Sequence, residues 1–370
     1  MNSTADPRFW LALIRAPGVG PAYGARLLEQ FGDPETALKA RSSAWKAAGI
    51  PAALHAGLKN LDEAGIEQDL KWLSGENRGL LTRDDPRYPE RLREIAHAPL
   101  VLFHQGDPGI LSRAQLAVVG ARSATPQGLE TAEAFAAELT RRGLLITSGL
   151  AQGIDGAAHR GALAAGGATV AVCGTGLDRV YPARHRELAH EIAVKGVLIS
   201  EFPTGTPPLA ENFPRRNRLL SGLSLGVLVV EAAPQSGSLI TARLALEQGR
   251  EVFAIPGSIH SPLSRGGHAL IRQGAKLTET VHDILEELAP LLGDEFELGP
   301  GADDGVEIAE KLDPGLKSVL EALGFEATPF DVLVERLSMP LEALSSALLT
   351  LELQGRIASA PGGAYLRLRG

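Results

Sequence analysis

Several features that mark whole classes of protein are scarce or missing in this sequence of 370 residues. Its one cysteine, Cys173, excludes an intrachain disulfide and a cysteine-based zinc site and fits a reducing compartment. No run of about 18 apolar residues occurs, so we expect no membrane span. The apolar stretch Phe9–Ile14 is broken by Arg15 and Pro17, so we expect no signal peptide. These absences favour a cytoplasmic protein.

The sequence also lacks the usual motifs of nucleotide-dependent and hydrolytic enzymes. It has no G-x-G-x-x-G after a predicted strand, no Walker A lysine motif, no G-x-S-x-G and no histidine cluster with metal-ligand spacing. Asp155 and His159 stand one helical turn apart, but a helix cap or a local ion pair explains them more simply than a metal does. No general acid–base pair stands out. We therefore expect binding rather than catalysis, with no cofactor and no metal.

Charge is distributed unevenly along the chain. The net charge of −8 argues against a protein that coats DNA generically. Residues 113–287 carry 17 basic and 16 acidic side chains, whereas residues 288–370 carry 6 and 14. A site for a polyanion is therefore expected as a local patch in the middle of the chain.

The middle of the chain alternates between short apolar runs and amphipathic helical patterns. Continuous apolar strands between helices indicate a mostly parallel sheet covered on both faces, which is an α/β, Rossmann-like, doubly wound domain over residues 79–288. Two further strand candidates, Leu80–Thr82 and Leu100–His104, precede it. The expected strands are Leu116–Val119, Leu144–Thr147, Thr169–Cys173, Val197–Ser200, Val227–Glu231 and Val252–Ile255. The expected helices are Pro126–Arg142, Ile154–Ala165, Arg184–Val194, Arg216–Leu223, Leu239–Gln248 and Gly267–Gln273.

Smaller units flank this domain. Residues 1–75 are predicted to form short helices, and the turn Pro17–Pro21 between two of them is typical of a helix-hairpin-helix (SAM-like) unit, or of a simple helical packing corner. Residues 289–313 are rich in Gly, Asp, Glu and Pro and are predicted to be a linker. Residues 314–370 have three helical patterns and a hairpin, which is the layout of a winged helix.

Polar turns follow the predicted strands at the edge where open α/β sheets bind ligands. Arg122 follows the first strand, and its side chain suits an anion. Small residues including Ser148 and Gly149 follow the second, so backbone N–H groups there could surround a phosphate. Gly176 and then Arg184 follow the third. Loop ion pairs and solvated helix starts are the alternative interpretations for both arginines.

The densest basic run lies after the fourth strand, and a hydroxyl-rich turn lies after the fifth. In Phe213–Arg218 an aromatic ring stands beside three arginines and an asparagine, a combination that suits a stacked base and its phosphates. A solvated charge run is the alternative. Ser236, Gly237 and Ser238 open a helix and can face an anion.

These turns resemble the DprA/Smf family over about residues 80–287, and the flanking units resemble its longer members. The matching strings are V-V-G-A-R (residues 118–122), S-G-L-A-Q-G-I-D (148–155), F-P-R-R-N-R (213–218), Q-S-G-S-L-I-T-A (235–242) and A-I-P-G-S (254–258). The resemblance implies a homodimer that binds single-stranded DNA, protects it from nucleases and loads RecA onto it in natural transformation. Single-strand-binding protein is a further candidate partner.

The resemblance also assigns residues to roles. Ala210 and Glu211 stand where family members often have a lysine, and Arg215 is the expected replacement. The implied dimer contacts are His268, Ile271 and Leu277, and the implied RecA contacts are Arg243 and Leu246. The implied DNA contacts are Arg122, Phe213, Arg215, Asn217, Arg218, Ser236, Gly237 and Ser238.

Two further considerations limit this interpretation. The predicted helix Leu341–Leu353 contains Glu342 and Glu352 but no Lys or Arg, so the winged helix is expected to pack against protein rather than read duplex DNA. The competing hypothesis is a nucleotide-processing, phosphoribohydrolase-like enzyme of the same fold. Such enzymes carry P-G-G-x-G-T-x-x-E, and residues 235–242 lack the glutamate. A pure protein-interaction scaffold is the third hypothesis.

Overall fold

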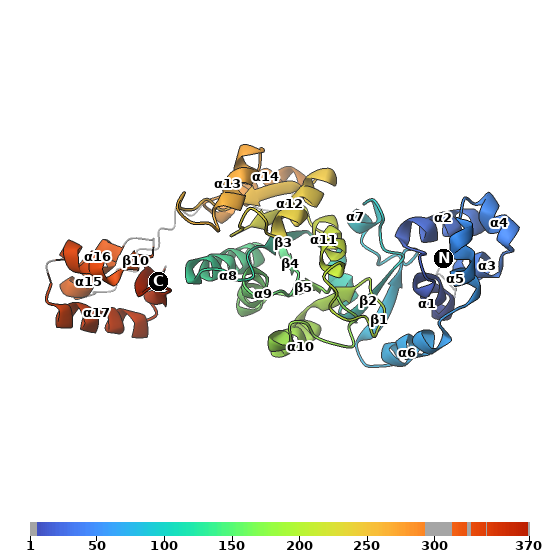
Figure 1. Ribbon diagram of the computed structural model, residues 1–370, viewed down its shortest axis with the longest axis horizontal. Helices are drawn as coiled ribbons and strands as arrows, with labels where there is room; N and C mark the ends of the chain where they lie inside the picture. Colours follow the sequence, from blue (N-terminus) through green and yellow to red (C-terminus); the bar gives the residue numbers. More distant parts are fainter. Residues whose placement is uncertain (1–5, 293–312, 324–326, 338, 369–370) are drawn as a thin grey trace.

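The computed structural model describes residues 6–292, 313–323, 327–337 and 339–368. N-terminal helices lie at one end of its longest axis, a central sheet lies in the middle, and a small C-terminal unit lies at the other end (Figure 1). This is the three-part organisation that the sequence predicts. Within the described ranges, no helix combines the length and apolar character needed to cross a bilayer.

Short helices with strong start signals form the N-terminal unit. Asp6, Asp33 and Asp62 each cap a helix by accepting a hydrogen bond from a backbone N–H of its first turn. Trp10 and Trp45 are buried in the core between the helices. The elements are α1 (Pro7–Arg15), α2 (Pro21–Phe31), α3 (Pro34–Lys39), α4 (Ser42–Ala47), η1 (Ala52–Leu54), α5 (His55–Lys59) and α6 (Glu63–Leu73).

A nine-stranded sheet follows, in the order β1-β2-β6-β5-β4-β3-β7-β8-β9. Pairing is parallel from β6 through to β9, whereas β2 pairs antiparallel with both β1 and β6. The mostly parallel sheet expected from the sequence is therefore confirmed. The strands are β1 (Arg78–Thr82), β2 (Val101–Gly106), β3 (Gln115–Val119), β4 (Leu145–Ser148), β5 (Thr169–Val172), β6 (Val197–Ser200), β7 (Gly226–Val229), β8 (Glu251–Ala254) and β9 (Lys276–Leu277).

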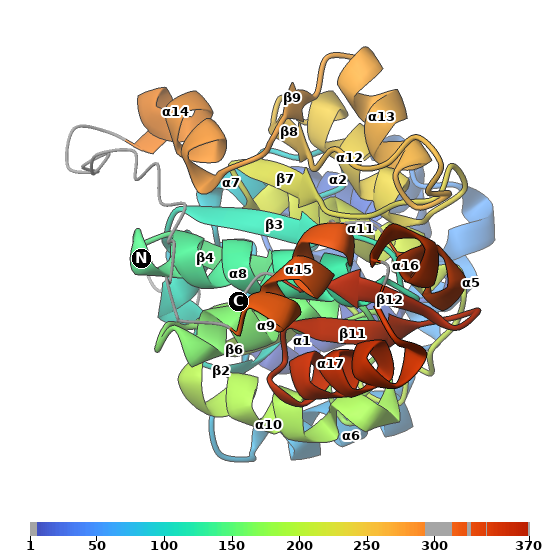
Figure 2. The same ribbon diagram turned by 90° about the vertical axis from the view of Figure 1, so that its left-hand side faces the viewer.

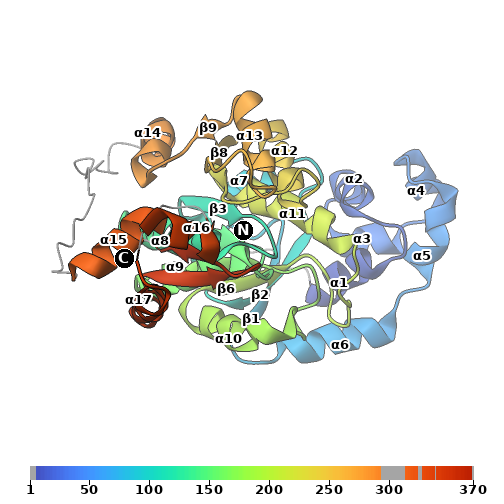
Figure 3. The same ribbon diagram turned by 60° about the vertical axis from the view of Figure 1, so that its left-hand side comes forward.

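Helices cover both faces of this sheet, because successive side chains of a strand point to opposite faces. Leu116 and Val118 of β3 share one buried apolar cluster with residues of α8, α9 and α14, whereas Ala117 and Val119 share another with residues of α7, α11, α12 and α13. Figure 3 shows these helices around the sheet. The elements are α7 (Glu90–Arg93), η2 (Pro108–Ser112), α8 (Pro126–Arg141), α9 (Ile154–Ala164), η3 (Ala183–His185), α10 (Arg186–Lys195), α11 (Asn212–Leu223), α12 (Ser238–Glu247), α13 (Arg265–Arg272) and α14 (Val281–Leu292).

Two boundaries differ from those predicted. Helix α14 runs to Leu292, into the predicted linker, because Ile284, Leu285 and Leu288 form an apolar stripe that is buried on the sheet. The rest of that linker, up to residue 312, lies outside the described residues. Helix α11 begins at Asn212, four residues earlier than expected from the sequence, because proline at position 214 is tolerated in a first helical turn.

The C-terminal unit is a winged helix, as predicted. Its three helices enclose a core that includes Leu333, Leu344 and Leu348, and its small sheet has the order β10-β12-β11 (Figure 2). Helix α17 spans the residues expected from the sequence, and its failure to read duplex DNA stays a prediction. The elements are α15 (Pro314–Leu323), β10 (Thr328–Pro329), α16 (Phe330–Leu337), α17 (Leu341–Leu353), β11 (Ile357–Ala360) and β12 (Ala364–Arg367).

Candidate nucleic-acid interface

A cleft opens where the strand order of the sheet reverses. β4, β5 and β6 follow on one side of β3, whereas β7 and β8 lie on its other side. Open α/β sheets bind ligands at the carboxyl ends of the strands at such a point. The cleft has a volume of about 690 Å³. Its walls come from the turns after β3, β4, β5, β7 and β8, from the loop before α11, and from the first turns of α11 and α12.

An aromatic platform forms one wall of the cleft. The exposed guanidinium of Arg122 lies over the ring of Phe213, with Cζ 5.3 Å from the ring centroid. The Tyr181 ring lies 5.7 Å from the Phe213 ring, tilted by 40°. Gly174 lies beneath Phe213, and a Cβ there would approach the ring to 3.0 Å. These residues follow β3, β5 and β6, so the fold combines a cation and two rings from distant segments.

The basic run at the start of α11 divides between three environments. Phe213, Arg216 and Asn217 line the cleft. Arg215 is exposed, lies over the Phe202 ring at 5.3 Å, and is not among the residues that line the cleft. Arg218 forms an ion pair with Glu201, and neither side chain lines the cleft. Arg218 is thus turned away from the cleft, contrary to the expectation, because successive residues of a helix point about 100° apart. A DNA contact by the exposed Arg215 stays a prediction.

Arg216, which lies in the string F-P-R-R-N-R, was not predicted to be a site residue. It is buried in the floor of the cleft, where Nη1 donates hydrogen bonds to the carbonyl oxygens of Gly149 (2.7 Å) and Val172. Gly149 makes room for it, since a Cβ at that position would lie 2.2 Å from Nη1. The role of Gly149 is therefore to leave space for the Arg216 side chain. Its amide also donates to Asp155, so it is not free to bind a phosphate.

Asp155 balances the charge of Arg216. Burial raises the pKa of Asp155, whereas the positive charge of Arg216 and hydrogen bonds from two backbone N–H groups act in the opposite direction. Burial likewise lowers the pKa of Arg216. The two groups are buried with opposite charges, each of which partly offsets the effect of burial on the other. The described residues hold no group of three or more His, Cys, Asp or Glu side chains suited to a metal.

Ser148 does not face the cleft. It is fully buried, and its hydroxyl donates to the carbonyl of Val118 at 2.6 Å, so it links β4 to β3. Gly176 and Arg184 are not among the lining residues either. The Gly176 amide donates to the carbonyl of Thr206 at 3.2 Å, and Arg184 is an exposed residue of η3. Ser148 is thus the last residue of β4, Gly176 and Arg184 follow β5, and none of the three reaches the cleft.

The hydroxyl-rich turn lies where the sequence predicts. Ser236, Gly237 and Ser238 line the cleft at the start of the ten-residue helix α12. The hydroxyls of Ser236 and Ser238 are 2.7 Å apart, and Asn217 donates to the carbonyl of Gly237 at 3.3 Å, which joins α11 to α12. A helix start with hydroxyl groups favours an anion.

Sequence reasoning missed one carboxylate at this edge. Glu231 follows β7 and accepts hydrogen bonds from the backbone N–H (2.9 Å) and the hydroxyl (2.6 Å) of Thr125. It therefore holds the start of α8 against the sheet. No local signal marks it, because the two residues are 106 positions apart.

The residues assigned to protein contacts lie apart from the cleft lining. Leu277 is 43% exposed on the edge strand β9, and Ile271 is partly buried on α13. His268 lies 3.0 Å from the carbonyl of Gly257 through Nε2. On α12, Arg243 and Leu246 are both exposed. Their roles remain predictions.

Comparison with known proteins identifies the family. The model described as DNA recombination-mediator protein A matches residues 79–289, more than half of the chain. The chain belongs to this family. Models for the DprA-like N-terminal HHH domain and the DprA winged helix domain match residues 4–56 and 307–363. The family expected from the sequence is confirmed.

Relatives of this family resemble the chain over most of its length. Protein Smf of Escherichia coli (strain K12) is 48% identical over 82% of this chain and 81% of its own length. Protein Smf of Synechocystis sp. is 34% identical over 99% of this chain and 100% of its own. The X-ray structure of DprA from Streptococcus pneumoniae superposes with a TM-score of 0.68, at 36% identity over 76% of this chain and 97% of that one.

A further solved structure is DNA processing protein A from Helicobacter pylori, for which a single-stranded DNA binding mode is described. It superposes with a TM-score of 0.53, at 28% identity over 58% of this chain and 96% of that one.

Proposed function

We propose that the cleft between α11 and α12 binds single-stranded DNA. The observation that carries this proposal is the platform of Phe213, Tyr181 and Arg122 beside the start of α12. An aromatic ring at a cleft wall can stack on a base only if that base is unpaired, and a guanidinium and a helix start can hold the adjoining phosphates. The single-stranded DNA binding mode described for the Helicobacter pylori relative supports the same ligand.

We further propose that the protein acts as a recombination mediator in the cytoplasm. In this role it holds and protects the strand taken up in natural transformation and loads RecA onto it. The exposed face of α12 with Arg243 and Leu246 is the proposed RecA contact. The edge of the sheet at β9, with His268, Ile271 and Leu277, is the proposed homodimer contact, because an exposed edge strand offers unpaired backbone groups to a second copy. Single-strand-binding protein is the other proposed partner.

Binding rather than catalysis is proposed because the carboxylates near the cleft have structural partners. Asp155 accepts two backbone N–H groups and faces Arg216, and Glu231 holds Thr125 with both oxygens. Both oxygens of Glu231 and Oδ2 of Asp155 are therefore engaged in structural hydrogen bonds. The start of α12, where a phosphoribohydrolase would carry its glutamate, presents Thr241 and Ala242 instead.

The experiment that tests this proposal measures binding of fluorescein-labelled oligo-dT by anisotropy, beside a matched duplex and a phosphoribohydrolase assay on nucleoside monophosphates. We expect tight, salt-sensitive binding of oligo-dT, weaker binding of the duplex, and no release of base. Release of base would favour the enzyme hypothesis. Absence of binding to either DNA would favour the scaffold hypothesis.

A further inference from the structure

The segment between β6 and α11 forms part of the cleft but has few anchors of its own. Pro208 and Ala210 line the cleft, and Phe213 follows at the start of α11. Residues 207–211 are exposed, and their hydrogen bonds stay within the segment or reach Asn212. The position of this wall therefore depends on what holds residues 203–206.

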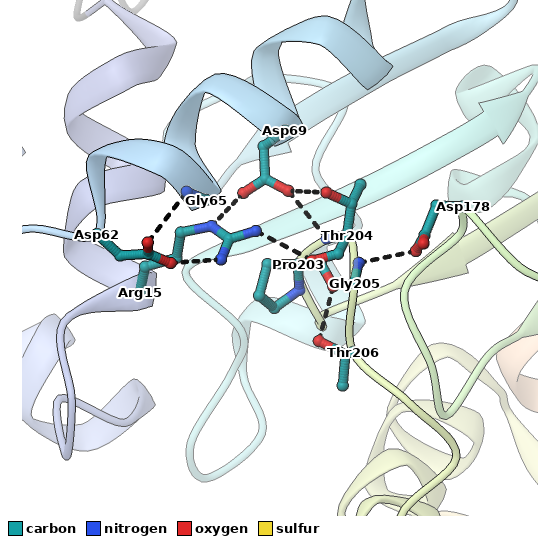
Figure 4. Close-up of polar contacts among 9 residues, drawn as sticks. All are labelled: Arg15, Asp62, Gly65, Asp69, Asp178, Pro203, Thr204, Gly205 and Thr206. Atoms are coloured by element: carbon teal, nitrogen blue, oxygen red, sulfur yellow. Dashed lines mark hydrogen bonds and ion pairs between the residues drawn. The ribbon is translucent and has the colours of Figure 1, made fainter.

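One of those residues, Thr204, is held by the N-terminal unit. Asp69 of α6 is fully buried, and its Oδ1 accepts hydrogen bonds from the backbone N–H (2.9 Å) and the hydroxyl (2.6 Å) of Thr204. Its Oδ2 accepts from Nε of Arg15, on α1, at 2.6 Å. Arg15 also donates to the carbonyl oxygen of Thr204 at 3.0 Å and pairs with Asp62 at 2.9 Å (Figure 4). Helices α1 and α6 thus both form hydrogen bonds with Thr204.

The same residues are joined to the other aromatic loop. The amide of Gly205 donates to Asp178 at 3.0 Å, and the amide of Gly176 donates to the carbonyl of Thr206 at 3.2 Å. Asp178 and Gly176 precede Tyr181, whose ring contacts Phe213. The hydrogen bonds that hold Thr204 therefore influence both loops of the aromatic platform, the one that carries Tyr181 and the one that leads to Phe213.

We propose that Asp69, together with Arg15, is a positioning residue for the cleft, through which the N-terminal helical unit orders the segment 203–211 and the aromatic platform. This inference rests on the proposed function. A loop that is ordered before the strand arrives has less conformational freedom to lose on binding. The N-terminal unit therefore contributes to DNA affinity without touching the DNA.

The test uses two variants of the full chain and a matched control. Thr204→Val removes one hydroxyl with little change of shape, and Asp69→Asn removes the ion pair with Arg15. Arg8→Gln is the control, because Arg8 joins the same two helices through Glu63 and Glu67 but does not touch the segment. Backbone amide exchange is measured over residues 177–182 and 203–213, and binding and dissociation are measured with fluorescein-labelled oligo-dT.

We expect Thr204→Val to speed exchange in these two segments about fivefold, since one hydrogen bond is lost. Asp69→Asn should speed it about tenfold or more. Both variants should bind oligo-dT about three- to tenfold more weakly through faster dissociation, whereas Arg8→Gln should match the unmodified chain in every measurement.

The outcomes separate this inference from the proposed function. If the unmodified chain binds oligo-dT but Thr204→Val and Asp69→Asn bind as it does, with unchanged exchange in both segments, the positioning role is wrong. If the variants lose affinity only in proportion to a global loss of folded protein, with exchange raised equally throughout, the role is likewise wrong. If the unmodified chain does not bind, the proposed function fails and this inference falls with it, whatever the exchange data show.

Discussion

Two arginines from the motifs that suggested DNA binding should respond in opposite ways to the same substitution. Arg122 is exposed at the cleft and lies over Phe213, so it is available to a phosphate. Arg218 is paired with Glu201, and their side chains are only 13% and 5% exposed. The change to be made is therefore Arg122→Gln in one variant and Arg218→Gln in the other.

The expected magnitudes follow from these environments. Each lost phosphate contact lowers the slope of log affinity against log salt by about 0.7 for a single strand. When the salt concentration rises tenfold, the affinity of the unmodified chain for oligo-dT should therefore fall by a factor about five times larger than the affinity of Arg122→Gln does. Arg218→Gln should leave the slope unchanged but destabilise the fold by about 3–5 kcal/mol, because it leaves the buried carboxylate of Glu201 without its partner. This replaces the expectation from sequence alone that Arg218 contacts a phosphate.

The assay is oligo-dT anisotropy at several salt concentrations, with thermal unfolding of each variant. Adding Glu201→Gln to the Arg218→Gln variant is the control, and it should recover much of the lost stability by removing the unpaired charge. A lowered salt slope for Arg218→Gln together with an unchanged slope for Arg122→Gln would refute the assignment of the cleft.

Four further predictions use other parts of the molecule. Phe213→Ala should cost about 1–3 kcal/mol per stacked base in oligo-dT affinity, whereas Phe213→Trp should retain it; equal affinity of all three proteins would place the DNA elsewhere. Burial lowers the pKa of His159 to about 3, so its proton is taken up mainly on unfolding. The contribution of neutral His159 to the free energy of unfolding is full above about pH 6.5 and falls by about 1.4 kcal/mol per pH unit as the pH drops toward 3. In urea unfolding from pH 7 to 4, His159→Gln should therefore lose stability less steeply than the unmodified chain, and an equally steep loss would contradict the lowered pKa. Leu277→Arg should convert a dimer to a monomer in light scattering and weaken RecA loading more than intrinsic DNA affinity; a monomeric unmodified chain would sink this prediction. The isolated C-terminal unit should bind duplex DNA weakly, and tight, salt-sensitive binding would show that its acidic helix is no obstacle.

The tautomer of His159 illustrates how the hydrogen-bond network supports the pH prediction. The hydroxyl of Thr169 donates to the carbonyl of Ile146, so its oxygen can only accept from Nδ1 of His159, 2.8 Å away. Nε2 therefore carries no proton, and it is buried with no partner. Protonation would place a charge there without an acceptor, which is why the neutral form is favoured.

Much of the architecture could be predicted from the sequence because its causes are local. Apolar runs of four to six residues between amphipathic stretches give the parallel sheet, and capping residues such as Asp33 and Asp62 mark helix starts. The place of the cleft, at the turns after β3, β4 and β7, could be predicted because open α/β sheets bind ligands at the carboxyl ends of their strands. Helix α14 was missed although Val281, Ile284, Leu285 and Leu288 recur at helical spacing, which is a local signal that the sequence does carry.

Side-chain assignments depended on the tertiary structure. The sequence by itself determined the parallel sheet, its flanking helical units and the edge at which the cleft opens, because hydrophobic period and turn chemistry act over a few residues. Only the tertiary structure decided that Arg122 faces the cleft, that Arg216 is its buried floor and that Arg218 turns away to Glu201. It alone brought Asp69 to Thr204 across 135 residues. The physical reason is that a side chain's partner is set by the packing of whole elements, which no local pattern encodes.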